Sequence, residues 1–172
     1  MLLASLVLLL GRAAAAEPPP VEPVAVEASP PPLAPAEGAD VTEAQLAALL
    51  ANPEGGTLVV NFFATWCEPC TAELGTLQRV LTPHGGVRGL LVSLDDARDG
   101  DRVRRFVRDR GLTLPMVHLV SSSPGAAAAR LVHNWPARIP VTLVIGPQGV
   151  EEARFVGSLL GPDLAAALIK RG

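Results

Sequence analysis

The two cysteines of this 172-residue chain, Cys67 and Cys70, lie three positions apart in the segment ATWCEPCTAE, residues 64–73. A pair at this spacing can form a structural disulfide, supply half of a metal site, or act as a redox pair. A structural zinc site usually needs four ligands. The chain has three histidines, none at ligand spacing to another. A metal site is therefore disfavoured, and we expect no metal or other cofactor.

A structural disulfide remains the main alternative to redox chemistry. A bond that closes so short a loop constrains the unfolded chain little, which makes it an inefficient use of the only pair. The redox interpretation has a mechanism. Cys67 would precede a helix, where free amide donors and the helix dipole favour its thiolate. Cys70, one turn further on, could then attack the mixed disulfide that Cys67 forms. Pro69 between them suits the first turn of that helix.

Helical and strand patterns alternate along the rest of the chain. Helices are predicted over 42–51, about 73–81, 96–111, 124–133 and from 161 onward, with Leu164, Leu168 and Ile169 facing inward. Strands are predicted over 57–63, 87–94, 116–120, 141–145 and 150–156. Parallel crossovers that lead into a terminal hairpin predict an α/β fold with a mixed sheet covered by helices.

The N-terminal region differs in composition from the rest. Residues 1–16 combine a short apolar run with small residues, which favours a signal peptide or N-terminal anchor over a buried core helix. Residues 17–39 hold eight of the seventeen prolines and are interpreted as an extended spacer rather than a docking peptide. The folded domain is expected over 40–172. We therefore expect an exported, extracytoplasmic protein.

Charge gives little indication of a polyanionic ligand. The formal net charge is −3, so nucleic acid is not an expected partner. The Arg-dense stretch over 96–111 is interleaved with aspartates and has apolar residues at helical spacing. This pattern is typical of an amphipathic helix with a solvated face, and it disfavours a phosphate site.

The segments FFATWCEPCTAE and RIPVTLVIGPQG resemble the thioredoxin superfamily, and most closely its exported ResA/TlpA-like branch of thiol-disulfide oxidoreductases. The resemblance implies a thioredoxin-like fold with Cys67 as nucleophile, Cys70 as resolving thiol and Trp66 as a cover over the site. It also implies a cis proline at Pro140, facing the cysteines and placing the backbone of Ile139 where a client can pair with it.

The resemblance extends from about residue 41 to the C-terminus, and a helix and strand within 96–120 resemble the insertion of the TlpA-like branch. Where thioredoxin has a buried aspartate, this chain has Asn61; the ResA-like branch instead has a glutamate that matches Glu73. Glu73 is expected to exchange a proton with Cys70, the alternative being a solvated helix residue. The family's kinking proline is replaced by Gly75, and its N-terminal hairpin by the helix predicted over 42–51.

The resulting hypothesis is an enzyme that reduces disulfides of exported proteins through a reversible Cys67–Cys70 disulfide. It implies disulfide-containing clients, of which apocytochrome c is the family's best-known type, a membrane or periplasmic electron donor, and a monomeric protein. The alternative is a non-catalytic binding module on the same fold with the disulfide permanently closed. A peroxidase-like relative is disfavoured because the chain has no distant second cysteine and a different motif spacing.

Overall fold

The computed structural model of the chain describes residues 38–82 and 86–169. The signal or anchor segment predicted at 1–16 lies outside the described residues, as does the spacer predicted at 17–39 except for its last two residues. Among the helices of the described part, none has the length and apolar character needed to cross a membrane.

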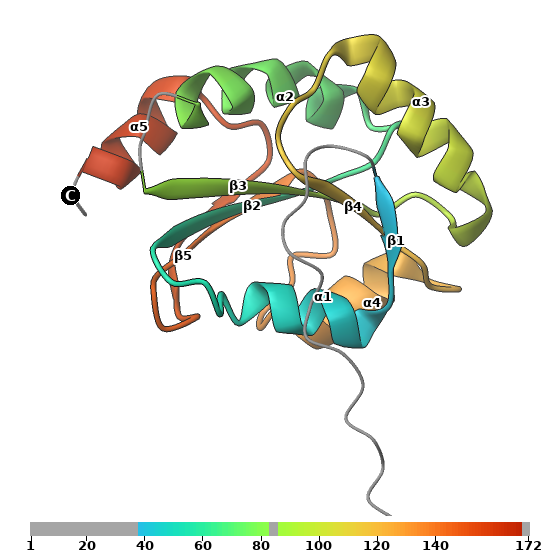
Figure 1. Cartoon of the computed structure of the whole chain (residues 1–172), viewed down its shortest axis with the longest axis horizontal. Coiled ribbons are helices and arrows are strands. Elements are labelled where there is room, and N and C mark those ends of the chain that lie inside the picture. The colour runs from blue at the N-terminus through green and yellow to red at the C-terminus, as the bar shows by residue number, and fades with distance from the viewer. Residues whose placement is uncertain (1–37, 83–85, 170–172) are drawn as a thin grey trace, which may run out of the picture.

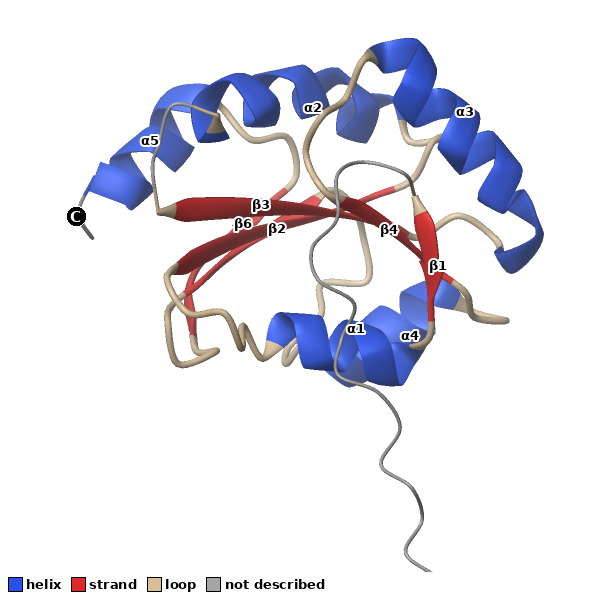
Figure 2. Cartoon of the chain, viewed as in Figure 1, coloured by secondary structure: helices blue, strands red, loops and turns tan. Residues whose placement is uncertain are grey.

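The described part of the chain forms one mixed sheet between two layers of helices (Figures 1 and 2). In chain order its elements are β1 (Ala39–Val41), α1 (Glu43–Leu50), β2 (Thr57–Phe63), α2 (Glu68–Leu81), β3 (Val87–Ser93), the 3-10 turn η1 (Ala97–Asp99), α3 (Gly100–Arg110), β4 (Met116–Leu119), α4 (Pro124–Leu131), β5 (Val141–Ile145), β6 (Glu151–Val156) and α5 (Gly161–Ile169). Helices α2, α3 and α5 cover one face of the sheet, and α1 and α4 cover the other (Figure 1).

The sheet has the strand order β1-β4-β3-β2-β5-β6. β1, β4, β3 and β2 run parallel to one another. β5 is antiparallel to β2, and β6 is antiparallel to β5. β2 lies near the centre, and six of its seven residues are buried because helices cover both faces. The α/β class, the mixed sheet and the terminal hairpin predicted from the sequence are confirmed.

Two apolar clusters, one on each face of the sheet, hold these layers together. On the α2 face, Leu74, Leu77 and Leu81 pack against strand residues and against Leu164 and Leu168 of α5. On the other face, α1 begins with a capping box in which Thr42 and Gln45 satisfy each other's backbone N–H groups. Apolar packing therefore holds α2 and α5 against one face of the sheet, and the capping box fixes where α1 begins on the other face.

The structure differs from the sequence prediction in three places. β1 was not predicted, because three residues are too few to show a periodic pattern. It pairs with β4 and lies just ahead of the helix predicted over 42–51. The helix predicted over 96–111 is divided, with the 3-10 turn η1 ahead of α3. Ile169, predicted to face inward with Leu164 and Leu168, is exposed because it lies on the outer side of α5 near the helix end.

The inserted helix and strand predicted within 96–120 are present as α3 and β4. β4 lies between β1 and β3, so the insertion widens the sheet on the side away from the hairpin. The segment that contains both cysteines follows directly after the C-terminal end of β2, and it is flanked by the end of β3.

Candidate active site

Cys67 and Cys70 form a disulfide at the start of α2, with their Cα atoms 5.3 Å apart. Cys67 is the N-cap residue, and Pro69 lies in the first turn of the helix. The N–H of Thr71 donates to the carbonyl of Cys67 at 3.0 Å, which continues the helix from the cysteine. Cys67 is 7% exposed and Cys70 is fully buried. Of the two cysteines, Cys67 is thus the one with exposed surface.

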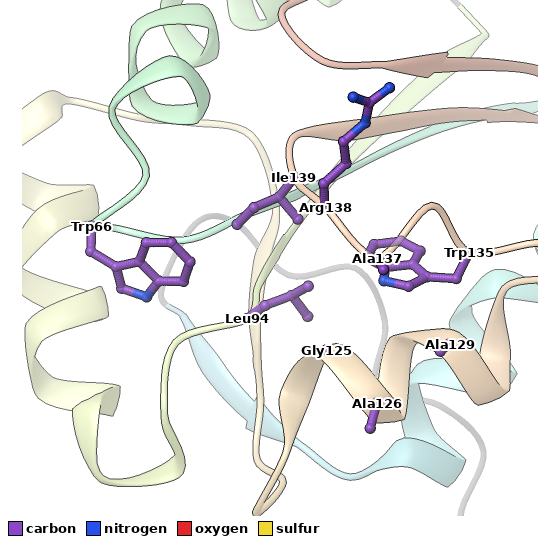
Figure 3. Close-up of a pocket in the computed structure, with 9 residues that line it drawn as sticks. All are labelled: Trp66, Leu94, Gly125, Ala126, Ala129, Trp135, Ala137, Arg138 and Ile139. Atoms are coloured by element: carbon purple, nitrogen blue, oxygen red, sulfur yellow. The ribbon is translucent and has the colours of Figure 1, made fainter.

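Trp66 lies beside the disulfide and is 66% exposed. Its indole borders a cavity of about 400 Å³, which is also lined by Leu94 at the end of β3, Trp135, Arg138 and Ile139 (Figure 3). The floor of the cavity on α4 consists of small residues, Gly125, Ala126 and Ala129. The region next to the cysteines is thus an apolar hollow with one cationic group at its edge.

The Ile139–Pro140 peptide bond is cis, as the resemblance implied. Pro140 is buried, and its carbonyl accepts a hydrogen bond from the N–H of Gly157 at 2.9 Å, which ties the turn to the end of β6. Ile139 is partly buried and packs against the apolar cluster that includes both cysteines. In Figure 3, the side chain of Ile139 points toward Trp66.

Glu73 is only 5% exposed, so the alternative of a solvated helix residue is wrong. Asn61 Nδ2 donates to its Oε1 at 2.9 Å, and the backbone N–H of Leu159 donates to its Oε2 at 2.6 Å. Burial raises the pKa of this carboxyl group above its ordinary value, and the two hydrogen bonds offset part of that rise. A carboxyl group whose pKa is shifted toward neutrality is suited to give and take a proton.

Asn61 connects Glu73 to the strand that follows the cis proline. Its Nδ2 also donates to Thr142 Oγ1 at 2.9 Å, from β2 across to β5. The residue that replaces thioredoxin's aspartate therefore holds the glutamate carboxyl in place. The sequence indicated the position of Asn61 but not this contact, because Thr142 lies 81 residues further along the chain.

Trp135, in the turn before the cis proline, also belongs to the site and was not predicted from the sequence. Its ring packs edge-on against Phe62 of β2, with ring centroids 5.1 Å apart and an interplanar angle of 74°. This contact fixes one wall of the cavity. The only signal in the sequence was a tryptophan in a loop that follows a predicted helix, which does not indicate what it contacts.

Within residues 38–82 and 86–169, no group of three His, Cys, Asp or Glu side chains is arranged so that it could hold a metal ion. What the site does bring together is a disulfide at a helix start, a buried carboxyl group and a cis-proline turn. Such an arrangement can exchange a disulfide with another molecule.

Comparisons with known proteins agree with this geometry. The sequence profile of the AhpC/TSA family matches residues 30–152. The thiol-disulfide oxidoreductase ResA of Oceanobacillus iheyensis is 32% identical over 112 residues, which cover 64% of this chain and 54% of that protein. The matched part thus spans little more than half the length of this relative.

Solved structures show the same fold. A secreted thiol-disulfide isomerase from Corynebacterium glutamicum superposes with a TM-score of 0.55 at 26% identity, covering 67% of this chain and 72% of that one. A thioredoxin-related protein from Neisseria meningitidis serogroup B gives a TM-score of 0.58 at 21% identity, covering 67% and 84%. The fold is thioredoxin-like, and the chain belongs to the AhpC/TSA family.

Proposed function

We propose that the protein is a thiol-disulfide oxidoreductase that reduces disulfides of exported client proteins through a reversible Cys67–Cys70 disulfide. The observation that carries this proposal is the pair itself: a closed disulfide at the N-cap of α2, with Cys67 slightly exposed, Cys70 fully buried, and the buried Glu73 one helical turn further on. The naming of the ResA relative as a thiol-disulfide oxidoreductase supports it.

The reaction starts from the reduced pair. The Cys67 thiolate attacks one sulfur of a client disulfide; that S–S bond breaks, and the other client sulfur leaves as a thiolate that takes up a proton. Cys70 then loses its proton and attacks Cys67 Sγ in the mixed disulfide. The second client thiol is released and the Cys67–Cys70 disulfide forms. Two electrons pass to the client, and an electron donor outside the cytoplasm must return two to the protein.

Glu73 is the proposed base for the second step. It lies one helical turn after Cys70 on α2, where residues three apart share a face. Its raised pKa means that it can accept the proton that Cys70 loses and return it in the reverse direction. Asn61 and Leu159 hold the carboxyl group in place throughout.

The client-binding surface is proposed to consist of Trp66, Ile139 and Pro140. Trp66 supplies an exposed aromatic face beside Cys67. Ile139 and Pro140 come directly before β5 and border the site, so an extended client segment is proposed to pair with the backbone of Ile139 as an added strand. The cavity between Trp66 and Trp135 has room for an apolar client side chain.

We place this activity outside the cytoplasm, with residues 1–16 as a signal peptide or membrane anchor and residues 17–39 as a spacer. The composition of these segments supports the assignment. The C. glutamicum neighbour is described as secreted, which agrees with it. Apocytochrome c is one candidate client, and the protein is proposed to act as a monomer.

A mixed-disulfide trap tests the proposal. In Cys70→Ser, Cys67 keeps its nucleophile role while the resolving thiol is lost, so exported clients should accumulate as reducible adducts on Cys67. The matched control Cys67→Ser, which retains the buried Cys70, should trap none. Brief iodoacetamide treatment of the reduced wild type, read by mass mapping, should modify Cys67 before Cys70. Equal adduct levels in the two variants, or alkylation of Cys70 before Cys67, would contradict the roles assigned to the two cysteines. No adduct although Cys67 is free would favour the binding module with a closed disulfide.

A further inference from the structure

Asp95, two residues after the end of β3, has a fully buried carboxylate that accepts four hydrogen bonds. The backbone N–H of Thr65 donates to its Oδ2 at 2.8 Å, and the hydroxyl of Thr65 donates to its Oδ1 at 2.6 Å. The hydroxyl of Ser93 donates to Oδ2 at 2.7 Å, and Arg102 Nη2 lies 2.7 Å from Oδ1. Every lone-pair direction that a carboxylate offers is thus engaged, which is what a buried charge requires.

Two of these four bonds hold a single residue of the segment that contains the cysteines. Thr65 lies in the turn that the N–H of Cys67 closes on the carbonyl of Ala64 at 3.1 Å. Asp95 binds both the backbone and the side chain of Thr65, so it fixes this turn at its midpoint. Helix α2 fixes the other side of Cys67. The position of the nucleophile therefore depends on Asp95 from one side and on the helix from the other.

Asp95 also brings an ion pair close to the cysteine. Desolvation by itself would raise the pKa of Asp95, but the hydrogen bonds from Thr65, Arg102 and Ser93 outweigh it and lower the pKa, so the group is ionised at neutral pH. Its partner Arg102 is half-exposed on α3 and also contacts Asp99 Oδ2 at 3.2 Å. The negative end of the pair faces the turn that contains Cys67, and the positive end faces solvent.

Other charged or titratable groups surround this pair and the cysteines, and they are common to all the variants below. They are Glu68 and Glu73 on α2, Asp96 and Asp99 around η1, His118 on β4 with Nε2 3.2 Å from the Asp95 carbonyl oxygen, Asp40 against His118 Nδ1, and Arg138, which lines the same cavity as Trp66. Unlike these groups, Asp95 contacts the turn directly through hydrogen bonds to its carboxylate.

We propose that Asp95 is a positioning residue for Cys67, and that the Asp95–Arg102 pair sets how readily Cys67 forms the attacking thiolate. This proposal rests on the function proposed above only in taking Cys67 as the nucleophile. Asp95 holds the turn, its negative charge opposes ionisation of Cys67, and Arg102 compensates that charge. Removing one member of the pair leaves the other uncompensated beside the cysteine.

The two halves of the pair must then act in opposite directions. In Asp95→Asn the shape is kept while the negative charge is lost, so the remaining Arg102 charge lowers the pKa of Cys67. In Arg102→Gln the carboxylate is left alone, and the pKa of Cys67 rises. We expect shifts of about half a unit each way, the size for a unit charge roughly 10 Å away at an effective dielectric constant of about 40. Asp95→Asn/Arg102→Gln should return close to the wild-type value.

The experiment measures the rate of Cys67 alkylation by iodoacetamide against pH in the full chain, in a Cys70→Ser background. Asp101→Asn is the matched control: it removes a carboxylate from the same helix that pairs with Arg104 and does not contact Thr65, and it should leave the profile unchanged. The reduction potential of the Cys67–Cys70 couple should rise in Asp95→Asn and fall in Arg102→Gln, since a more stable thiolate makes a stronger oxidant.

Loosening of the turn would act in the same direction in both variants, so shifts of the same sign, or no shift in either, overturn the proposal. If Asp95→Asn does not fold, the half-exposed Arg102→Gln decides it alone, and an unchanged or lowered pKa of Cys67 is then the contradicting result. Alkylation needs no client protein. The measurement therefore stands even if the mixed-disulfide trap captures nothing, and the two proposals fail separately.

Discussion

At the scale of single residues, Glu73 shows how the fold changes the chemistry of an ordinary side chain. Desolvation raises the pKa of Glu73 above 4.5, against the opposing hydrogen bonds from Leu159 and Asn61. The folded chain therefore keeps this proton to a higher pH than the unfolded chain does. The folded state loses stability as pH rises from 4.5 through the folded pKa, and above that value the buried charge is a full cost. A buried carboxyl group with a raised pKa beside the cysteine pair is a candidate for a role in the reaction.

Replacing Glu73 by Gln should slow disulfide exchange at least about tenfold at neutral pH, because the proton acceptor for Cys70 is lost. It should also remove from the pH–rate profile the ionisation that belongs to Glu73. The measurement is the rate at which the reduced protein reduces a small-molecule disulfide between pH 5 and 9. Glu73→Asp, which keeps a carboxyl group on a shorter side chain, should recover part of the rate and the pH dependence.

Stability provides an independent test of the same residue. The free energy of unfolding of the wild type should fall relative to that of Glu73→Gln as pH rises above 4.5, since only the wild type takes on a buried charge. Urea unfolding at several pH values measures this difference. A difference that stays constant with pH, together with a pH–rate profile that overlays the wild type, would leave Glu73 with a purely structural role.

The motif residues could be found from the sequence, whereas the contacts that support them could not. Cys67, Cys70, Glu73 and Pro140 stand at fixed spacings or at a recognisable strand start. The hydrogen bonds from Thr65 to Asp95 join residues 30 positions apart, and the hydrogen bond from Asn61 to Thr142 joins residues 81 positions apart. Contacts over such distances depend on how strands are ordered in the sheet. Periodicity along the chain contains no information about them.

At the scale of elements, the same reasoning explains which parts of the fold were predictable. β2 and β3 are rich in apolar residues on both faces because helices cover both faces of the sheet, and such segments are detectable without any structure. β1 has three residues and gains its place from hydrogen bonds to β4 alone. The irregular path before α3 arises at η1, where Asp96 and Asp99 leave helical geometry. Strong patterns were predictable, and short edge elements were not.

Helix α2 passes through Gly75 without interruption, although the family resemblance placed a kinking proline there. A Cβ added at Gly75 would meet only Arg79 Nη1, at an ordinary 3.5 Å. Gly75→Ala should therefore raise the free energy of unfolding by about 0.5–1 kcal/mol, because alanine loses less backbone entropy in a helix interior. Urea unfolding of the oxidised protein measures the change, and the reduction potential should stay at its wild-type value.

Gly89 on β3 is the matched control for that substitution. Its Cβ would lie 2.9 Å from Leu81 Cδ1 and 3.0 Å from Leu114 Cδ2, inside a packed cluster. Gly89→Ala should therefore destabilise the protein by about 1–3 kcal/mol through overpacking. If Gly75→Ala also destabilised the protein, the helix would need a bend at this position, as the family proline would give it.

At the scale of the whole molecule, the site lies where the sheet changes direction. β2 has parallel β3 on one side and antiparallel β5 on the other. The loop after β2 contains the cysteines, the end of β3 supplies Asp95, and the turn before β5 supplies the cis proline. Ligand sites in open α/β sheets form at the carboxyl ends of strands at such a point. Three distant segments meet there because of the strand order, and no single segment could build the site alone.

This placement also bears on the direction of electron flow. Both sulfurs lie in the apolar cluster under α2, and Cys70 is fully buried. Burial in an apolar cluster disfavours a charged group, so a thiolate at Cys70 gains little stabilisation from the fold. The disulfide fits the same cluster without any charged group. The folded protein should therefore favour the oxidised state of the pair relative to the unfolded chain.

The expected outcome is that the oxidised protein has the higher free energy of unfolding, by at least about 1.4 kcal/mol, which corresponds to a potential about 30 mV lower in the folded than in the unfolded pair. Urea unfolding with and without dithiothreitol measures this difference. The double variant Cys67→Ser/Cys70→Ser controls for the reductant and should unfold identically in both conditions. Because the stability difference and the shift in potential form one thermodynamic cycle, a reduced protein more stable than the oxidised one would mean that folding raises the potential. That result would favour donation of disulfides to clients over their reduction, with the same residues running the exchange in the opposite direction.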